Sequence, residues 1–373
     1  MDRMPYFLST LAFFVLLGVV VVVHELGHLV IARMNGVFCE AFSFGFGNVL
    51  FKRKDKRGTE WRISLLPLGG YVKMLGDADV SSVRETIPEG YTEEDMERLS
   101  AHRKKPWQRL LIAAGGPLAN FVFAVLVFFA LSEINGLPEY NNTISVVSEQ
   151  SLAYKSGLRT GDVITKANGV NVSNFVDIAG QIKKSAGGSL DLELLRDNNR
   201  ITLNIDMWVK NGEKTKPIDN LGIAPNGYKY TKVSTWEALK SSAMMTYNIA
   251  YKNMQAIFKI VAGKMSTKNV GGIISIFKVT SSSAEAGIAT FVTLIAVISA
   301  VLGAINLLPI PVLDGGSIAI SAIEWIIGRP LNKKVVNAIF TAGLVIVAGL
   351  MLLGLWNDLE NIRFLNWMEN LFK

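Results

Sequence analysis

The stretch Val19–His28, which reads VVVVVHELGH, places two histidines and a glutamate at the end of a nearly unbroken apolar run that begins at Tyr6. On an α-helix, residues i and i+4 share one face, so His24 and His28 can reach the same metal ion. Two such imidazoles suit tetrahedral zinc, and Glu25 could then act as general base on a water molecule at the metal. The alternative is a chance match in which both histidines face another helix. Ionisable side chains in a bilayer are costly and usually functional, which favours the metal site.

A catalytic zinc site usually has three protein ligands and one open position, so a third ligand must come from elsewhere in the chain. His102 lies in a charged segment that we expect to be aqueous, and the single cysteine, Cys39, is more simply explained as a buried residue. The favoured candidate is Asp314, which follows another apolar run in the sequence Asn306–Gly316, NLLPIPVLDGG. An aspartate in that setting needs a partner. A metal ion held by it and the two histidines keeps a position open for water and a substrate carbonyl.

An HExxH motif in a first membrane helix, with a distant LDG motif in a later one, closely resembles the site-2 protease family of intramembrane zinc metalloproteases. Three further stretches resemble its bacterial RseP-type branch: Leu66–Met74, Gly116–Asn120 and Asn306–Gly315. The resemblance implies an endopeptidase with one zinc ion per chain. Its substrate would be the transmembrane helix of a single-span membrane protein, such as an anti-sigma factor already trimmed by another protease, or a remnant signal peptide.

The composition fits a membrane protein, since half of the 373 residues are hydrophobic and they gather in long runs. The net charge of +7 does not indicate a nucleic-acid partner, because the basic residues stand largely beside the apolar runs, where lipid headgroups and topology explain them. One cysteine excludes an internal disulfide. We expect the first apolar run to be retained rather than cleaved as a signal peptide, because it is long, contains the HExxH motif and is not followed by a small-residue cleavage site.

Four runs are long enough to cross about 30 Å of hydrocarbon. They are Tyr6–Ala32, Leu110–Leu131, Ile288–Ile310 and Val335–Trp356. Lysines and arginines flank the loops between the first and second runs and between the third and fourth, so both loops are predicted to be cytoplasmic and both termini to lie outside. His28 and Asp314 then lie toward the cytoplasmic side of a bacterial inner membrane. The predicted fold is a polytopic α-helical membrane protein with four transmembrane helices, a membrane-associated β-hairpin region and an inserted α+β domain of PDZ type.

Residues 37–75 alternate apolar and small or polar side chains on both sides of a basic turn at Lys52–Gly58. This pattern predicts a β-hairpin with one apolar face and a charged tip. In the site-2 protease family a matching hairpin dips into the membrane beside the zinc. The resemblance implies that its edge, at Gly69 and Gly70, binds an extended substrate as an added strand. The alternative is an ordinary hairpin at the lipid headgroups.

Two asparagines are candidate substrate-binding residues. Asn306 could hold the backbone of an extended substrate, because such a backbone needs donors and acceptors in an apolar site. The alternative is a polar contact at the end of a helix. Asn120 follows the small residues Gly115 and Gly116. It could contact a neighbouring helix, or it could support the metal site or polarise the substrate, and the sequence favours neither interpretation.

Residues 136–228 are less hydrophobic and contain four short stretches of alternating pattern. Gly157–Ile164 and Asn168–Gly169 resemble the PDZ module. Asn220–Ile223 resembles the loop with which an ordinary PDZ module begins, so the resemblance implies a single, circularly permuted PDZ domain on the periplasmic side. Its groove, between that closing strand and a helix at Ser173–Ser185, could bind a peptide. The alternative is a spacer or size filter that binds none.

The rest of the chain divides into an N-terminal membrane core (1–135), a connector (229–287) and a C-terminal membrane core (288–373). The first core includes a cytoplasmic linker, Asp77–Lys105, with a short helix near Glu93–His102. The connector begins with a long amphipathic helix, Ser234–Val261, predicted to lie on the outer membrane surface or on the PDZ domain. Val270–Ile276 stands where the family has a Gly-Pro-Ile-Gly-like element, and the tail Asn357–Lys373 is predicted to be amphipathic.

Two other functions remain open at this stage. One is a non-catalytic membrane scaffold or receptor, with a structural metal and a peptide-binding PDZ domain. The other is a transporter with a metal in its pathway, which the lack of an internal repeat between the two pairs of spans weakens. The intact glutamate of HExxH and the open ligand position favour the enzyme.

Overall fold

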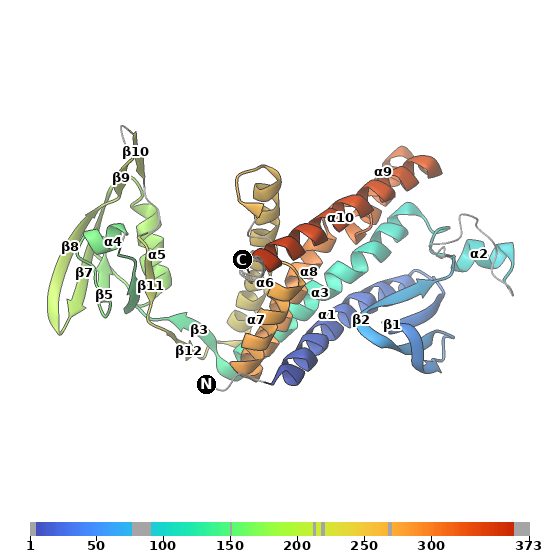
Figure 1. The fold of residues 1–373 in the computed structure, drawn as a ribbon, viewed down its shortest axis with the longest axis horizontal. Helices are drawn as coiled ribbons and strands as arrows, with labels where there is room; N and C mark the ends of the chain where they lie inside the picture. The colour runs from blue at the N-terminus through green and yellow to red at the C-terminus, as the bar shows by residue number, and fades with distance from the viewer. Residues whose placement is uncertain are drawn as a thin grey trace, which may run out of the picture. The chain divides into compact units, whose positions relative to one another are not determined.

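A computed structural model describes residues 5–76, 91–149, 151–211, 214–217, 221–267 and 271–361. The chain divides into two compact units, one formed by residues 1–131 and 239–373 and the other by residues 132–238. Long helices dominate the first unit and short strands the second (Figure 1).

Four helices are long and apolar enough to cross a membrane, which confirms a polytopic helical membrane protein. They are α1 (Tyr6–Met34), α3 (Pro106–Asn135), α8 (Ile288–Asn306) and α10 (Lys333–Asn361). Leu16 and Val20 of α1 are buried with Ile295 of α8. Ala124 of α3 is buried with Ala300 of α8, and such small residues let two membrane helices approach closely.

The boundaries of the last two spans differ from the prediction. α8 ends at Asn306 rather than at Ile310, because Pro309 and Pro311 cannot continue a helix. A turn at 307–313 follows, and it leads into α9 (Asp314–Ile327), a helix that was not predicted from the sequence. α10 extends to Asn361, so residues 357–361 of the predicted tail are part of the last span. Residues 362–373 lie outside the described residues.

Two strands, β1 (Cys39–Lys54) and β2 (Glu60–Met74), form an antiparallel sheet. Both strands are bent, so that Ala41–Phe44 pairs with Glu60–Ile63 at the start of β2 and also with Gly70–Lys73 near its end. Gly45, with a φ of +89°, makes the bend in β1, since residues with a Cβ rarely adopt that conformation. The sheet packs on the second half of α1 through a buried cluster that includes Leu29, Ala32, Val37, Cys39, Phe42 and Met74.

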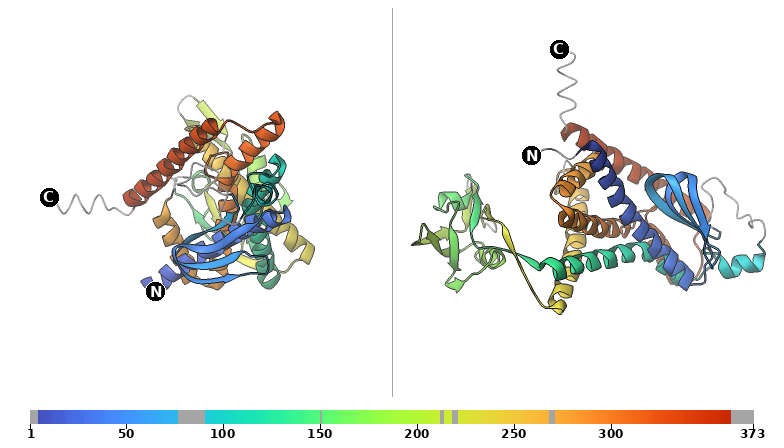
Figure 2. Two further views of the ribbon diagram at one scale, coloured as in Figure 1. Left: turned by 90° about the vertical axis from the view of Figure 1, so that its right-hand side faces the viewer. Right: turned by 90° about the horizontal axis from the view of Figure 1, so that it is seen from below.

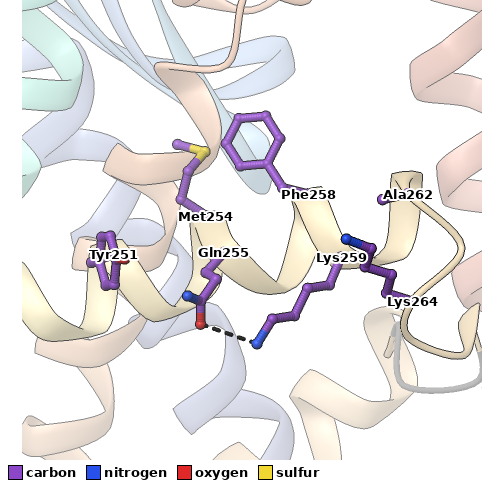
Figure 3. A pocket seen from close by; sticks show the side chains of 7 residues that line it. All are labelled: Tyr251, Met254, Gln255, Phe258, Lys259, Ala262 and Lys264. Carbon is purple, nitrogen blue, oxygen red and sulfur yellow. Dashed lines mark hydrogen bonds between the residues drawn. The ribbon is translucent and has the colours of Figure 1, made fainter.

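α6 (Thr235–Val261) is a single long helix, close to the predicted range. Ser242 and Thr246 are buried, whereas large apolar side chains along the helix are exposed. A groove of about 360 Å³ lies near its C-terminal end. Figure 3 shows the side chains that line it, which are Tyr251, Met254, Gln255, Phe258, Lys259, Ala262 and Lys264. On its rim, Lys259 Nζ donates a hydrogen bond to Gln255 Oε1 at 3.2 Å. An apolar face edged by lysines is typical of a helix at a lipid interface.

The first unit contains two further short helices. α2 (Glu93–Leu99) is the predicted linker helix and begins with a capping box formed by Thr92 and Asp95; residues 77–90 lie outside the described residues. α7 (Ile273–Glu285) was not predicted, and it follows Gly271–Gly272 of the element expected at 270–276. It bridges α1 and α10, because Ser281 Oγ lies 2.8 Å from Ser9 Oγ while Asp358 accepts hydrogen bonds at the α7 N-terminus.

The second unit is an α+β unit. Its strands are β3 (Leu137–Tyr140), β4 (Ile144–Val147), β5 (Val163–Ala167), β6 (Val170–Asn171), β7 (Ser189–Arg196), β8 (Asn199–Asp206), β9 (Trp208–Asn211), β10 (Lys214–Pro217), β11 (Ile223–Pro225) and β12 (Tyr228–Thr231). Its helices are α4 (Leu152–Lys155) and α5 (Phe175–Lys184). The main sheet has the order β6-β5-β7-β8, while β11 pairs with β4 and β12 with β3. Leu190, Leu192 and Leu194 alternate along β7 and are buried with Ile178 and Ile182 of α5.

Candidate metal centre

The HExxH residues lie where α1 packs against α3. Figure 2 shows these two helices converging beside the β1–β2 sheet. Gly27 permits the close approach, because a Cβ on it would lie only 2.2 Å from the carbonyl oxygen of Gly115. The helical spacing turns His24 and His28 to the same side, with their Nε2 atoms 3.3 Å apart.

Asp314 joins this pair from the other end of the sequence. Its Oδ2 lies 3.1 Å from His24 Nε2, and its Oδ1 lies 3.3 Å from His28 Nε2. These three side chains are the group of His, Cys, Asp and Glu residues, within the described ranges, that is placed to hold a metal ion. Cys39 is not part of it and is buried between the sheet and α1. His102, the other alternative ligand, is not part of it either.

The turn before α9 aims Asp314 at the histidines. Val312 has a φ of +91°, which is a strained conformation for a β-branched residue. Gly315 packs directly on the preceding turn, since a Cβ on it would lie 2.0 Å from the carbonyl oxygen of Leu308. The same holds for Gly316, whose Cβ would lie 2.6 Å from the carbonyl oxygen of Ile310. The two glycines after the aspartate are therefore required by the sharp return of the chain.

The ligand atoms lie at spacings that suit a tetrahedral zinc site. Zinc–ligand bonds of about 2.0–2.1 Å place neighbouring ligand atoms about 3.3–3.4 Å apart. The two imidazole nitrogens are 3.3 Å apart, His24 Nε2 is 3.1 Å from Asp314 Oδ2, and His28 Nε2 is 3.3 Å from the other carboxylate oxygen, Oδ1. One ligand atom from each residue lies within 4.8 Å of the other two. In addition, Asp314 Oδ2 is buried without a hydrogen bond from any described residue, so its lone pairs are available to a cation.

Gly116 of α3 leaves the space that an ion needs. A Cβ on Gly116 would lie 2.4 Å from His28 Nε2 and 2.7 Å from His24 Nε2. Both distances are shorter than real Cβ contacts, so a side chain at this position would push the two ligand nitrogens out of their present places. Gly116 begins the stretch Gly116–Asn120 that carries the family resemblance, but the sequence does not show that it faces the two histidines.

The remaining ring nitrogens of the histidines face α3. His28 Nδ1 lies 2.8 Å from the carbonyl oxygen of Ile112, which can only accept a hydrogen bond. The proton of a neutral His28 is therefore on Nδ1, and Nε2 is free to bind a metal. His24 Nδ1 lies 3.2 Å from Asn120 Nδ2. Asn120 is fully buried, and its backbone oxygen accepts a hydrogen bond from Ser299 of α8.

Glu25 faces the β1–β2 sheet. The position of a Cβ on Gly70 is 3.5 Å from Glu25 Cγ and 2.7 Å from the carbonyl oxygen of Ser43, so a glycine is needed to bring β2 this close. The backbone N–H of Val72 donates a hydrogen bond to the Glu25 carboxylate. The segment Gly70–Met74, which pairs with β1, thus runs beside the predicted general base.

Gly69 and Asn306 are the other two predicted substrate-binding residues. Gly69 has a φ of +139°, and the ring of Phe46 covers it, with Cε2 2.5 Å from the position of a Cβ. Phe46 is 45% exposed and stacks on Tyr71. Asn306, at the end of α8, has its Nδ2 3.4 Å from His24 Nε2. Its amide is therefore a donor at the edge of the metal-ligand group.

Two ion pairs attach the neighbouring elements to this core. Arg33 of α1 donates hydrogen bonds to Asp55 at 2.5 Å and to Thr59 at 2.7 Å, which ties the turn of the sheet to the end of α1. Burial would raise the pKa of Asp55, but hydrogen bonds from Arg33 and Trp61 lower it to about 2. Asp55 lies outside the membrane-spanning helices, and Arg33 belongs to the last turn of α1.

The second ion pair joins α3 to α9. Arg109 pairs with Glu324, whose side chain is 5% exposed and also accepts a hydrogen bond from the backbone N–H of Leu331 at 2.7 Å. α9 is thereby held at its far end while Asp314 stands at its first turn. This pair was not predicted from the sequence, because 215 positions separate its members and neither residue belongs to a motif.

Comparison with known proteins gives matches along nearly the whole chain. The profile of peptidase family M50 matches residues 12–350. Metalloprotease MmpA of Caulobacter vibrioides is 33% identical over 385 residues, covering 95% of this chain and 96% of the relative. An Agrobacterium fabrum protein described as a candidate zinc metalloprotease is 32% identical over 362 residues, with 94% and 95% covered. Zinc metalloprotease RasP of Bacillus licheniformis is 28% identical over 422 residues, with 95% and 99% covered.

Proposed function

Because this chain belongs to peptidase family M50, the site-2 proteases, and is a zinc metalloprotease of that type, we propose that His24, His28 and Asp314 hold its zinc ion and that Glu25 is its general base. The observation that carries this proposal is the convergence of the two imidazole Nε2 atoms and the Asp314 carboxylate, whose two oxygens lie 3.1 Å from His24 and 3.3 Å from His28. Two imidazoles and a carboxylate are a donor set that catalytic zinc takes, with one position left for water or substrate.

The mechanism follows from the residues around that position. When bound, the zinc ion polarises the scissile carbonyl and makes a water molecule more acidic. Glu25 accepts a proton from the attacking water and passes it to the leaving amine. Asn306, whose amide lies beside His24, donates a hydrogen bond to the substrate carbonyl or to the next peptide group.

The substrate must reach Glu25 in an extended form, because the peptide bonds of a transmembrane helix are shielded by its own hydrogen bonds. We propose that the unwound segment adds to the sheet along Gly70–Met74. Main-chain hydrogen bonds to that segment would replace those lost on unwinding, which is essential in an apolar medium. Gly70 has no side chain, so this edge of β2 runs close to Glu25.

The substrates proposed are transmembrane segments of single-span membrane proteins, with anti-sigma factors in regulated intramembrane proteolysis and remnant signal peptides as the expected members. The proposed location is the bacterial inner membrane, with both termini outside and the metal toward the cytoplasmic side, as the positions of lysine and arginine favour. The lipid bilayer would contact α6 along its exposed apolar face.

The second unit is proposed to be the circularly permuted PDZ domain of an RseP-type protease, spanning 136–228 on the periplasmic side. Two features support this. The closing strand β11 pairs with β4, the second strand of the unit, and Leu221 just before β11 shares a core with Ile178 and Ile182 of α5. A peptide end binding between β11 and α5 would be its ligand.

The experiment is cleavage of a tagged single-span substrate in membranes, with zinc content measured on the same preparations. Glu25→Gln should retain zinc and lose cleavage, since it removes the base and keeps the ligands. Glu149→Gln, an exposed glutamate of the second unit, is the matched control and should retain both. Cleavage by the Glu25→Gln protein would refute the role of Glu25. Zinc in every variant with cleavage in none would move weight to a structural metal in a scaffold.

A further inference from the structure

The contact between His24 and Asn120 contains a conflict that metal binding must resolve. Asn120 turns its amide nitrogen, a donor, toward His24 Nδ1 at 3.2 Å. That contact requires His24 Nδ1 to be an acceptor, so the proton of the neutral ring would be on Nε2. Nε2 is the atom that lies 3.1 Å from Asp314 Oδ2 and 3.3 Å from His28 Nε2. A proton there would exclude a metal ion from the group.

A second observation concerns the other end of the same amide. Asn120 Oδ1 is buried and accepts no hydrogen bond from any described residue. The amide can rotate by 180° about its last side-chain bond, which exchanges its oxygen and nitrogen with almost no change in shape. In that orientation the oxygen faces His24 and can accept a hydrogen bond from Nδ1–H. His24 then has the same arrangement as His28, whose Nδ1 already faces a carbonyl oxygen of α3 at 2.8 Å.

We propose that Asn120 is a positioning residue: its amide oxygen accepts a hydrogen bond from the Nδ1–H of His24 and so keeps Nε2 of that histidine free for the metal. The proposal rests on the metal-ligand set proposed above. It assigns to Asn120 a role different from substrate binding, consistent with a side chain that is 0% exposed. Partners of this kind fix both the tautomer and the orientation of a metal-binding histidine.

The test is the zinc affinity of the full-length protein, measured in detergent by competition with a chelating dye. Asn120→Asp supplies only acceptors and should bind zinc at least as tightly as wild type. Asn120→Leu has a similar volume and no acceptor, and it should bind zinc about 10- to 100-fold more weakly, the usual effect of losing such a partner. The visible spectrum of the Co²⁺ form reports on ligand geometry, and it should change in the Leu variant only.

Ser299→Ala is the matched control, because Ser299 contacts the backbone oxygen of Asn120 and not His24. Its zinc affinity should equal that of wild type. If Asn120→Asp lost affinity as Asn120→Leu does, or if Asn120→Leu kept full affinity with a raised KM, the positioning role would be wrong. The Asp variant decides the question even if the Leu variant does not fold. His24→Ala separates this result from the ligand proposal, which fails if that variant retains full zinc affinity.

Discussion

A single methyl group at Gly116 should remove the metal from this protein. A Cβ there would stand 2.4 Å from His28 Nε2, against the 3.0 Å below which real Cβ contacts essentially do not occur, a shortfall of 0.6 Å. Zinc–nitrogen bonds tolerate deviations of only about 0.2 Å. The histidines therefore cannot move far enough to accept the methyl group and still share one ion.

We expect Gly116→Ala to lower zinc affinity by more than about 100-fold, which corresponds to about 2.7 kcal/mol of binding free energy. The free energy of unfolding of the metal-free protein should fall by about 1–3 kcal/mol, because the added methyl group overpacks only one contact between helices. Zinc content after dialysis at fixed free zinc measures the first quantity. Denaturant unfolding in the presence of a chelator measures the second.

Two glycines provide controls for this experiment. Gly349 of α10 has open space around its Cβ position, so Gly349→Ala should change neither quantity. Gly303 of α8 meets Phe121 and the Pro117 carbonyl oxygen of α3 at 3.1 Å. Gly303→Ala crowds a contact between α8 and α3 that contains no metal ligand, so it should affect stability without affecting zinc. Unchanged zinc affinity in Gly116→Ala would refute the location of the metal beside this residue.

Three further predictions concern the supports of the site. Because the native pKa of Asp55 is about 2, below its usual 3.8, its ionised form stabilises the fold fully above about pH 4 and less as pH falls toward 2. The difference in Tm between the metal-free wild type and metal-free Asp55→Asn should therefore shrink over that range. A constant difference would contradict this prediction. Arg109→Met should lower the free energy of unfolding, measured with denaturant, by about 3–5 kcal/mol, because it leaves buried Glu324 without its cation. The double variant Arg109→Met/Glu324→Leu should recover most of that free energy. A double variant as unstable as Arg109→Met would contradict the ion-pair argument. Val312→Gly should stabilise the folded protein by up to about 2 kcal/mol, since about 1–3 kcal/mol of backbone strain is relieved and about 0.5–1 kcal/mol is lost to the greater chain entropy of glycine. A lower Tm with unchanged zinc affinity would show that the backbone at residue 312 is not strained.

Periodicity was sufficient to predict the four spans and the long helix α6, because each is a long segment with one dominant pattern. The i,i+4 histidines were sufficient to predict their shared face, because that geometry belongs to a single helix. Asp314 could be chosen from its setting, but its place at the first turn of α9 could not. α9 begins only because the chain turns back after Pro311, and that turn depends on Gly315 and Gly316 packing on the preceding backbone.

The residues that were missed share one property: their importance depends on a neighbour distant in sequence. Gly116 matters because two histidines of α1 face it, and the Ile112 carbonyl matters because it faces His28. No composition or spacing within α3 contains this information. The bend of the β1–β2 sheet was missed for a similar reason, since pairing of Ala41–Phe44 with both ends of β2 cannot be read from alternation alone.

The missed residues share a single stripe of α3 with Asn120, which was already a candidate from the sequence. Ile112, Gly116 and Asn120 are spaced by four, the same spacing as His24 and His28 on α1, so the two stripes face each other along the helix contact. One position supplies a carbonyl acceptor, the next supplies empty space, and the third supplies an amide. Three residues before this stripe, Arg109 holds the helix that carries Asp314. α3 provides none of the proposed ligands, yet it fixes the protonated nitrogen of each histidine, leaves space beside them at Gly116 and holds the helix that carries Asp314. Substitutions that abolish zinc binding should therefore map to α3 as often as to α1.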